Sequence, residues 1–136
     1  MKIFKAMETS ASGLTAERLR LDLIAGNVAN AHTTRTEEGG PYRRKTAVFA
    51  EVLDRAGRSG QGVKVDSIRV DDTDPIMEYD PEHPDADAEG YVAYPNINIL
   101  QEVTDMITAS RSYEANVTVL NASKSMIAKA LEIGRG

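Results

Sequence analysis

The last third of the chain, residues 99–133, carries the pattern that most restricts how this sequence can fold. Residues recur there at alternating intervals of four and three, which is the spacing of a coiled-coil seam. Eight of the ten positions are apolar, and the full set is Ile99, Val103, Met106, Ser110, Tyr113, Val117, Leu120, Lys124, Ile127 and Leu131. A helix of this length spans about 52 Å, which exceeds what a small domain needs to cover its core. We therefore expect it to pack against a partner.

Signals for the start and the end of this helix are present. Asn98 is a good N-cap residue, and Gln101 occupies the position that completes a capping box. Gly134 is expected to end the helix, because glycine readily adopts the left-handed conformation found at helix ends. Lys124, a polar residue within the seam, is expected to extend to solvent along its aliphatic stem.

The N-terminal region repeats the same alternation. Six of its eight seam positions are apolar, and the set is Ile3, Met7, Ser10, Leu14, Glu17, Leu21, Ile24 and Val28. A helix through these residues would be about 39 Å long. Asn27 and Asn30 are expected to end it, since Asn tolerates the left-handed conformation. Long amphipathic helices are thus predicted at both termini.

The region between these helices has the character of a small β module. Residues 33–41 predict a loop, and four short segments predict strands: 42–49, 63–70, 76–79 and 91–94. Residues 47–53 are equally compatible with one or two helical turns, and the second strand changes phase near Ser67, which indicates a bulge.

We therefore predict an α+β fold in which two long terminal helices form a coiled-coil-like layer. These helices belong to an assembly domain of residues 1–34 and 96–136, which brackets a β-rich insert of residues 35–95. Periodicity leaves open whether the helices pair within one chain or between chains, because both arrangements bury the same seam.

Composition narrows the possible functions. The net charge is -5, and acidic residues are concentrated in the middle of the chain, which argues against sequence-independent nucleic-acid binding. The absence of cysteine excludes disulfides and thiolate metal sites. No apolar run is long enough for a membrane span, and the N-terminal residues lack a secretory signal. These residues alone would predict a soluble cytoplasmic protein.

Candidate ligand sites are weak. Asp85, Asp87 and Glu89, followed by Gly90, match the opening of an EF-hand calcium loop, but Asn96 lies where a bidentate Glu is needed. A solvated acidic loop is the favoured interpretation. The two histidines, His32 and His83, would have to meet from distant loops to bind zinc. No nucleophile motif is present, so we predict neither an active site nor a cofactor.

Several motifs resemble those of a known family. Residues 12–30 (SGLTAERLRLDLIAGNVAN) resemble the N-terminal motif shared by bacterial flagellar rod, hook and related axial proteins. Residues 105–117 (DMITASRSYEANV), with Leu120 and residues 130–134, resemble the C-terminal motif of the same proteins. Residues 40–45, 62–65 and 79–92 are similar to those of the proximal rod proteins within this family.

This resemblance implies a structural subunit of the flagellar basal-body rod. It implies that the terminal helices form the inner layer of a helical tube in the periplasm, with the β insert outside. The implied partners are copies of this chain and other rod proteins, without nucleic acid or small-molecule substrate. It also implies export through the flagellar type III apparatus without a cleaved signal, which replaces the cytoplasmic expectation.

The expected assembly interface consists of the apolar seam residues and Asn30, namely Ile3, Met7, Leu14, Leu21, Ile24, Val28, Asn30, Ile99, Val103, Met106, Tyr113, Val117, Leu120, Ile127 and Leu131. Helices held by so thin a seam are expected to complete their folding only when neighbours supply the missing burial. Two alternatives remain at this point: a stand-alone coiled-coil adaptor, and a calcium-binding module that uses Asp85, Asp87 and Glu89.

Overall fold

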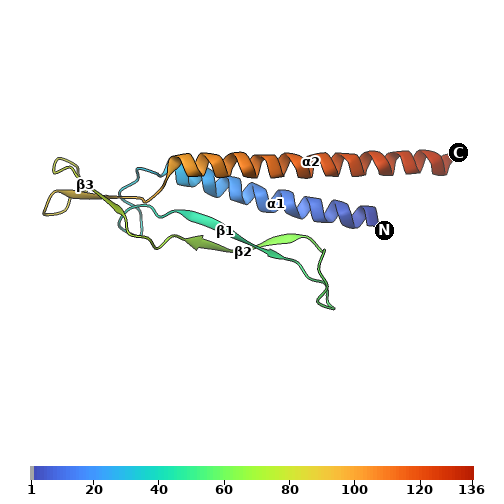
Figure 1. Cartoon of the computed structure of the whole chain (residues 1–136), viewed down its shortest axis with the longest axis horizontal. Helices are drawn as coiled ribbons and strands as arrows, with labels where there is room; N and C mark the ends of the chain where they lie inside the picture. Colours follow the sequence, from blue (N-terminus) through green and yellow to red (C-terminus); the bar gives the residue numbers. More distant parts are fainter. Residues whose placement is uncertain (1) are drawn as a thin grey trace.

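The computed structural model describes residues 2–136. Helix α1 (Lys2–Ala29) and helix α2 (Ile99–Arg135) run antiparallel and side by side along the long axis of the molecule (Figure 1). Both termini lie at one end of this axis. The chain between the helices forms two small antiparallel sheets, so the predicted α+β fold, with terminal helices that bracket a β insert, is confirmed.

Helix α2 begins as predicted and ends later than predicted. The side chain of Asn98 accepts a hydrogen bond of 3.2 Å from the backbone N–H of Gln101, which confirms the N-cap. The Gln101 side chain donates to Asp105 instead of to the cap, so only half of the capping box forms. Gly134 does not end the helix, because glycine inside a last turn costs only about 1 kcal/mol; the helix continues to Arg135 and is capped by Gly136.

Helix α1 has the predicted extent, but the predicted reason for its end is wrong. No non-glycine residue of the described chain has a positive φ, so neither asparagine is left-handed. Asn27 lies inside the helix and is fully buried. Asn30 instead closes the last turn by donating from its side chain to the carbonyl of Gly26 at 2.9 Å.

The first sheet pairs β1 (Lys45–Glu51) with β2 (Val63–Val70), and it packs against α1. The predicted bulge is confirmed: Val48 faces Ser67 while Phe49 faces Val65, which leaves Asp66 as the extra residue. The helical alternative for residues 47–53 is wrong, because most of that segment is strand β1. The β1–β2 loop returns to α1, where Ser12 Oγ accepts a hydrogen bond of 3.1 Å from the Val63 N–H.

The second sheet pairs β3 (Ile76–Tyr79) with β4 (Tyr91–Tyr94), and both strands were predicted. It lies at the end of the molecule opposite the termini (Figure 1). Within the described chain, neither of these strands packs against a helix. The two sheets are therefore separate from each other, and only the first packs against a helix.

Little apolar side chain is buried anywhere in residues 2–136. The buried hydrophobic residues are few and most of them are small, namely Ala16, Ile24, Ala31, Val92 and Ala109. Two of the three largest fully buried side chains, Asn27 and Glu102, are polar. No described helix has the length and apolarity to cross a membrane. The helix pair is therefore held by close backbone approach and polar contacts more than by a large core.

Candidate assembly interface

The two helices touch through small side chains. The small residues that are buried on the two helices are Ser10 and Ala16 of α1 and Ala109 and Ser123 of α2. The helices approach closely at Gly13, since a Cβ added there would lie 3.0 Å from Asn116 Nδ2. On α2 the contact residues Glu102, Ala109, Asn116 and Ser123 recur every seven positions, which is the coiled-coil spacing. Small and polar residues at this spacing are a signal that the apolar seam alone does not reveal.

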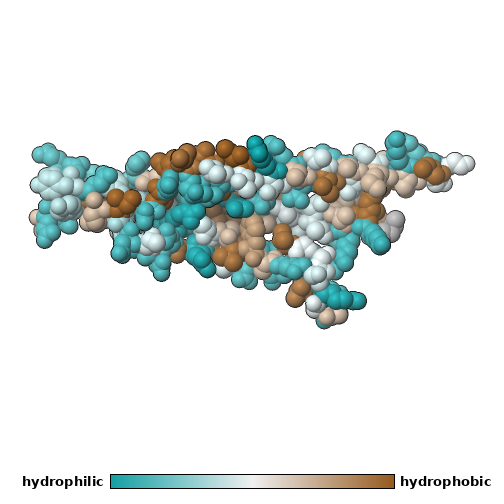
Figure 2. All heavy atoms as spheres, viewed as in Figure 1, coloured by the Kyte–Doolittle hydropathy of each residue, from teal (hydrophilic) through white to brown (hydrophobic). Residues whose placement is uncertain are grey.

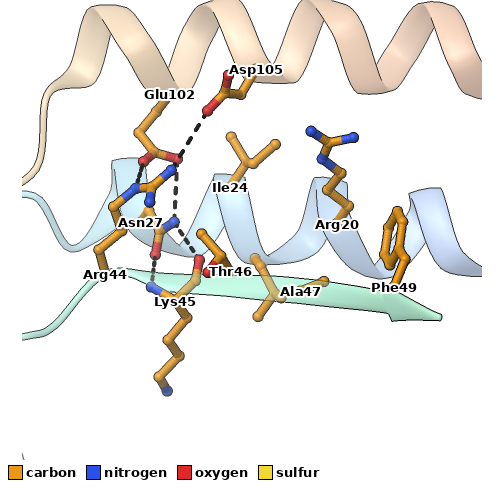
Figure 3. A pocket seen from close by; sticks show the side chains of 11 residues that line it. Arg20, Ile24, Asn27, Arg44, Lys45, Thr46, Ala47, Phe49, Glu102 and Asp105 are labelled. Atoms are coloured by element: carbon orange, nitrogen blue, oxygen red, sulfur yellow. Dashed lines mark hydrogen bonds and ion pairs between the residues drawn. The ribbon is translucent and has the colours of Figure 1, made fainter. Parts of the chain in front are cut away.

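A buried polar cluster fixes one end of the pair. Glu102 from the first turn of α2 is 1% exposed and Asn27 from the last turns of α1 is 0% exposed. The Asn27 amide donates to Glu102 Oε2 at 3.2 Å and to the Lys45 carbonyl at 2.8 Å (Figure 3). Arg44, just before β1, donates to the other carboxylate oxygen of Glu102 and lies 3.6 Å from Asp105. Three segments distant in sequence therefore meet at one point.

The same cluster satisfies the other half of the Asn27 side chain. Its carbonyl oxygen accepts hydrogen bonds from the Lys45 backbone N–H at 2.9 Å and from the Tyr42 hydroxyl at 3.1 Å. Burial and the nearby Glu102 carboxylate raise the pKa of Tyr42, so this phenol remains a donor at neutral pH. We call Asn27, Tyr42, Arg44, Lys45 and Glu102 the polar clasp. The sequence did not predict this cluster, because Asn27 was expected, together with Asn30, to end a helix.

A groove of about 330 Å³ opens beside the polar clasp, between α1, α2 and β1. Its charged lining groups are engaged with protein partners: Arg44 pairs with Glu102, and Arg20 stacks 5.9 Å from the centroid of Phe49. These groups hold the helices to the sheet. The groove therefore offers a packing surface, and no nucleophile and base face each other across it.

The predicted interface residues are brought to the helix surfaces but are incompletely covered. Only Ile24 is buried. Ile99, Val103 and Leu131 are exposed, and the remaining eleven are half-buried: Ile3, Met7, Leu14, Leu21, Val28, Asn30, Met106, Tyr113, Val117, Leu120 and Ile127. The α2 residues that contact α1 each lie one position before a residue of the predicted seam, such as Val103, Ser110 or Lys124. The internal contact and the predicted seam therefore overlap on only part of the helix surface.

An uncovered apolar surface lies on the first turns of α2. Ile99, Leu100, Val103 and Ile107 are 42%, 76%, 41% and 51% exposed. Together they form what we call the exposed stripe, visible as a continuous apolar patch on this end of α2 (Figure 2). Contiguous apolar surface of this kind typically marks an interaction site. The sequence predicted Ile99 and Val103 for such a site and missed Leu100 and Ile107.

The carboxylates of the predicted calcium loop are bonded to other groups of the protein. Asp87 accepts backbone hydrogen bonds from Glu89 and Tyr91, while Asp85 pairs with Arg35 and accepts from Thr34 at 2.7 Å. These bonds shape the loop itself. In residues 2–136 no three His, Asp or Glu side chains lie together as metal ligands would.

The two histidines do approach one another, through an aromatic residue. His32 and His83 place their rings edge-on to Tyr94, with ring centroids 6.4 and 6.2 Å away. They pack the loop after α1 against the second sheet. Their role in the described structure is therefore packing.

Comparison with known proteins identifies the family. A model of flagella basal body rod proteins matches residues 7–35, and one of the FlgEFG basal-body rod C-terminal region matches residues 88–133. The chain is 46% identical to the flagellar basal-body rod protein FlgC of Borreliella burgdorferi, over 100% of both chains. It is 45% identical to FlgC of Bacillus subtilis and 40% identical to FlgC of Escherichia coli, each over 99% of this chain and 100% of the relative. This chain belongs to the FlgC family of rod proteins.

Membership in the FlgC family accounts for the arrangement described above. The two matched regions cover most of α1, and β4 with nearly all of α2. The chain is thus a structural subunit of the flagellar basal-body rod. Neither the adaptor nor the calcium-binding alternative receives support from these relatives.

Proposed function

We propose that this FlgC-family chain builds the rod by packing its helix pair against neighbouring rod subunits, with the β insert on the outside. The observation that carries this proposal is the incomplete cover of the seam: of fifteen predicted interface residues only Ile24 is buried. Burial of apolar surface gives about 25 cal/mol per Å². Neighbouring helices that cover these residues would therefore stabilise both partners. The partners we propose are copies of this chain and other rod proteins.

The same thin core suits a subunit that must travel unfolded. We propose export by the flagellar type III apparatus, without a cleaved signal, to a periplasmic position in the rod. The few buried apolar residues and the uncovered seam favour a chain whose helices become fully ordered on assembly. The proposed role is structural, and no catalytic function is assigned.

Substitution within the exposed stripe tests this proposal. Val103→Asp, in cells that lack the native subunit, is expected to abolish swimming in soft agar, because a carboxylate would be placed in the subunit contact. Thr108→Asp is the matched control, since Thr108 is exposed on the same helix outside the stripe. Both purified chains should unfold within about 0.5 kcal/mol of the wild type. Normal swimming with Val103→Asp would contradict the proposed contact.

A further inference from the structure

We propose that one face of the β3–β4 sheet docks a basic segment, rich in arginine or lysine, of a protein other than this chain. We call this face the outward sheet face. Met77 pairs with Ala93 and Tyr79 with Tyr91, and paired residues share a side of a sheet, so the face consists of Met77, Tyr79, Tyr91 and Ala93. The inference rests on the proposed function, and it adds a contact of the β insert with a partner of defined chemistry.

The outward sheet face is apolar and uncovered. Met77, Tyr79 and Tyr91 are 51%, 67% and 41% exposed, whereas Val92 on the opposite side of β4 is 0% exposed. The sheet projects beyond the helix pair at one end of the molecule (Figure 1), and within residues 2–136 neither strand packs against a helix. Tyrosine is enriched among the residues that dominate protein interfaces, because its ring supplies a large contact area. This face therefore has the character of a docking surface.

The two tyrosine rings are held in place before any partner binds. Their centroids lie 5.3 Å apart in an edge-to-face arrangement. Gly90 leaves room for the Tyr79 ring, because a Cβ there would lie 2.8 Å from Tyr79 Cε2. Asp87 Oδ1 accepts hydrogen bonds of 2.9 Å from the backbone N–H groups of Glu89 and Tyr91, and these bonds shape the loop between the strands. A surface that is ordered in advance loses less entropy on binding.

Charge defines the kind of partner that fits this face. Residues 71–98 contain nine Asp and Glu residues and no Lys or Arg. Of these nine, only Asp85 forms an ion pair within residues 2–136. The corresponding end of the molecule is predominantly hydrophilic in Figure 2. A partner is therefore expected to bring positive charges, which the acidic surroundings attract and orient.

The tyrosine rings give a second, independent reason for a cationic partner. The face of an aromatic ring attracts Arg and Lys, and the attraction is stronger where the contact excludes water. This chain makes such contacts elsewhere: Cζ of Arg20 lies 5.9 Å from the centroid of Phe49. Nζ of Lys45 lies 5.6 Å from that of Tyr42. No Lys or Arg of residues 2–136 lies over a tyrosine of the outward sheet face, so a cation from another protein can occupy that position.

The partner is expected to differ in sequence from this chain. The chain has a net charge of -5, so its copies repel one another on average. Several of its own cations are also engaged, since Arg35, Arg44 and Arg58 form ion pairs within the chain. We therefore assign the contact to another protein that carries an unpaired basic segment.

Site-specific photocross-linking in cells tests the contact. Met77 is replaced by p-benzoylphenylalanine in the full-length chain, in cells that lack the native subunit, and basal bodies are isolated after irradiation. The matched control carries the same group in place of Ser59, which is exposed in the β1–β2 loop. Mass spectrometry should show that position 77 links to a different protein, at a segment of net positive charge. The yield should be at least about fivefold above that of position 59 with the same segment, because docking raises the local concentration.

The pattern of links separates this contact from the proposed function. Links from position 77 only to copies of this chain or to an acidic segment, equal yields from the two positions, or no link at all in swimming cells would each overturn the inference. If Val103→Asp abolishes swimming while position 77 gives no link to a basic segment, the helix contact stands and only the sheet contact is refuted.

Replacement of one ring tests the cationic chemistry directly. The probe is a fluorescent octapeptide of alternating arginine and leucine, added to the purified full-length chain at low salt and followed by anisotropy. Tyr79→Leu should weaken binding at least about fivefold, because it keeps apolar area but removes the ring, whereas Tyr79→Phe should change it less than about twofold. Tyr91→Leu supplies the same comparison if Tyr79→Leu fails to fold. Equal affinity of the wild type and these variants would show a response to net charge alone and would refute the ring contact.

Discussion

The side-chain amide of Asn27 donates to Oε2 of Glu102 across 3.2 Å and joins two residues that are 75 positions apart in the chain. The bond links the last turns of α1 to the first turn of α2. Because both groups are buried and Arg44 also donates to Glu102, this contact sets the register of the helix pair.

Replacement of Asn27 by Ala is expected to lower the free energy of unfolding by about 2–4 kcal/mol, because it leaves buried groups of Lys45 and Glu102 without partners. Urea denaturation followed by circular dichroism measures this loss. Asn30→Ala is the matched control, because Asn30 bonds only to partly exposed local groups and should lose less than about 1 kcal/mol. Similar losses of unfolding free energy in the two variants would show that the polar clasp contributes no more to stability than a local helix-end bond.

Gly13→Val is expected to destabilise the chain by about 1–3 kcal/mol, because a Cβ there already lies 3.0 Å from the Asn116 amide and further methyl groups would force the helices apart. Gly13→Ala should lie within about 1 kcal/mol of the wild type, since its gain in helix propensity offsets a small shift of Asn116. Thermal unfolding of both variants gives the comparison. A Val variant as stable as the Ala variant would mean that the helices do not approach closely.

Gly62→Ala is expected to be more harmful than Gly57→Ala. Both glycines have positive φ, at 108° and 73°, so both substitutions strain the backbone. A Cβ at Gly62 would also overlap the Ser12 hydroxyl, whereas nothing lies within 4 Å of a Cβ at Gly57. The difference in unfolding free energy, about 1–2 kcal/mol, therefore reports the contact of the β1–β2 loop with α1. No difference would place this loop away from the helix.

Acid should weaken the loop that holds Asp85. The hydrogen bond from the Thr34 hydroxyl, and then the Arg35 guanidinium, lower the pKa of Asp85 below its ordinary value of 3.8. The Asp85 carboxylate therefore binds a proton more readily in the unfolded chain than in the folded one. The stabilisation by Asp85 is complete above pH 3.8 and is lost as the pH falls through the lower pKa of the folded state.

Asp85→Asn should show a shallower fall in unfolding midpoint than the wild type as the pH drops below 3.8. Asp71 and Asp54 also have lowered pKa values, so the test compares the slopes of the two proteins and not their absolute acid lability. Parallel slopes would mean that Asp85 is not linked to folding.

The repeat of apolar residues was sufficient to predict both helices, and short alternating runs with glycine turns predicted the strands. The bulge near Ser67 was readable because a change of phase reverses which side chains share a face. Gly134 misled, since a single glycine is a weak stop signal when its neighbours favour helix.

The polar clasp and the packing of small residues were not predictable in the same way. Nothing near Asn27 in the sequence indicates that Glu102 and the Lys45 backbone will reach it, because these partners meet only after the chain turns back. Ser10 and Ala109 carry little apolar signal, yet their size permits the close helix approach. Apolar periodicity therefore located the uncovered surface better than it located the internal contact.

The polar clasp lies at only one end of the helix pair. There Asn27 and Glu102 are pinned by several directional bonds, whereas the helix ends that carry the termini touch through short side chains such as Ser10 and Ser123. Helices that are joined by hydrogen bonds at one end resist sliding along each other, whereas their other ends are free to separate. Such a subunit keeps the register of α1 and α2, while the ends that carry the termini can separate and make room for a helix of a neighbouring subunit.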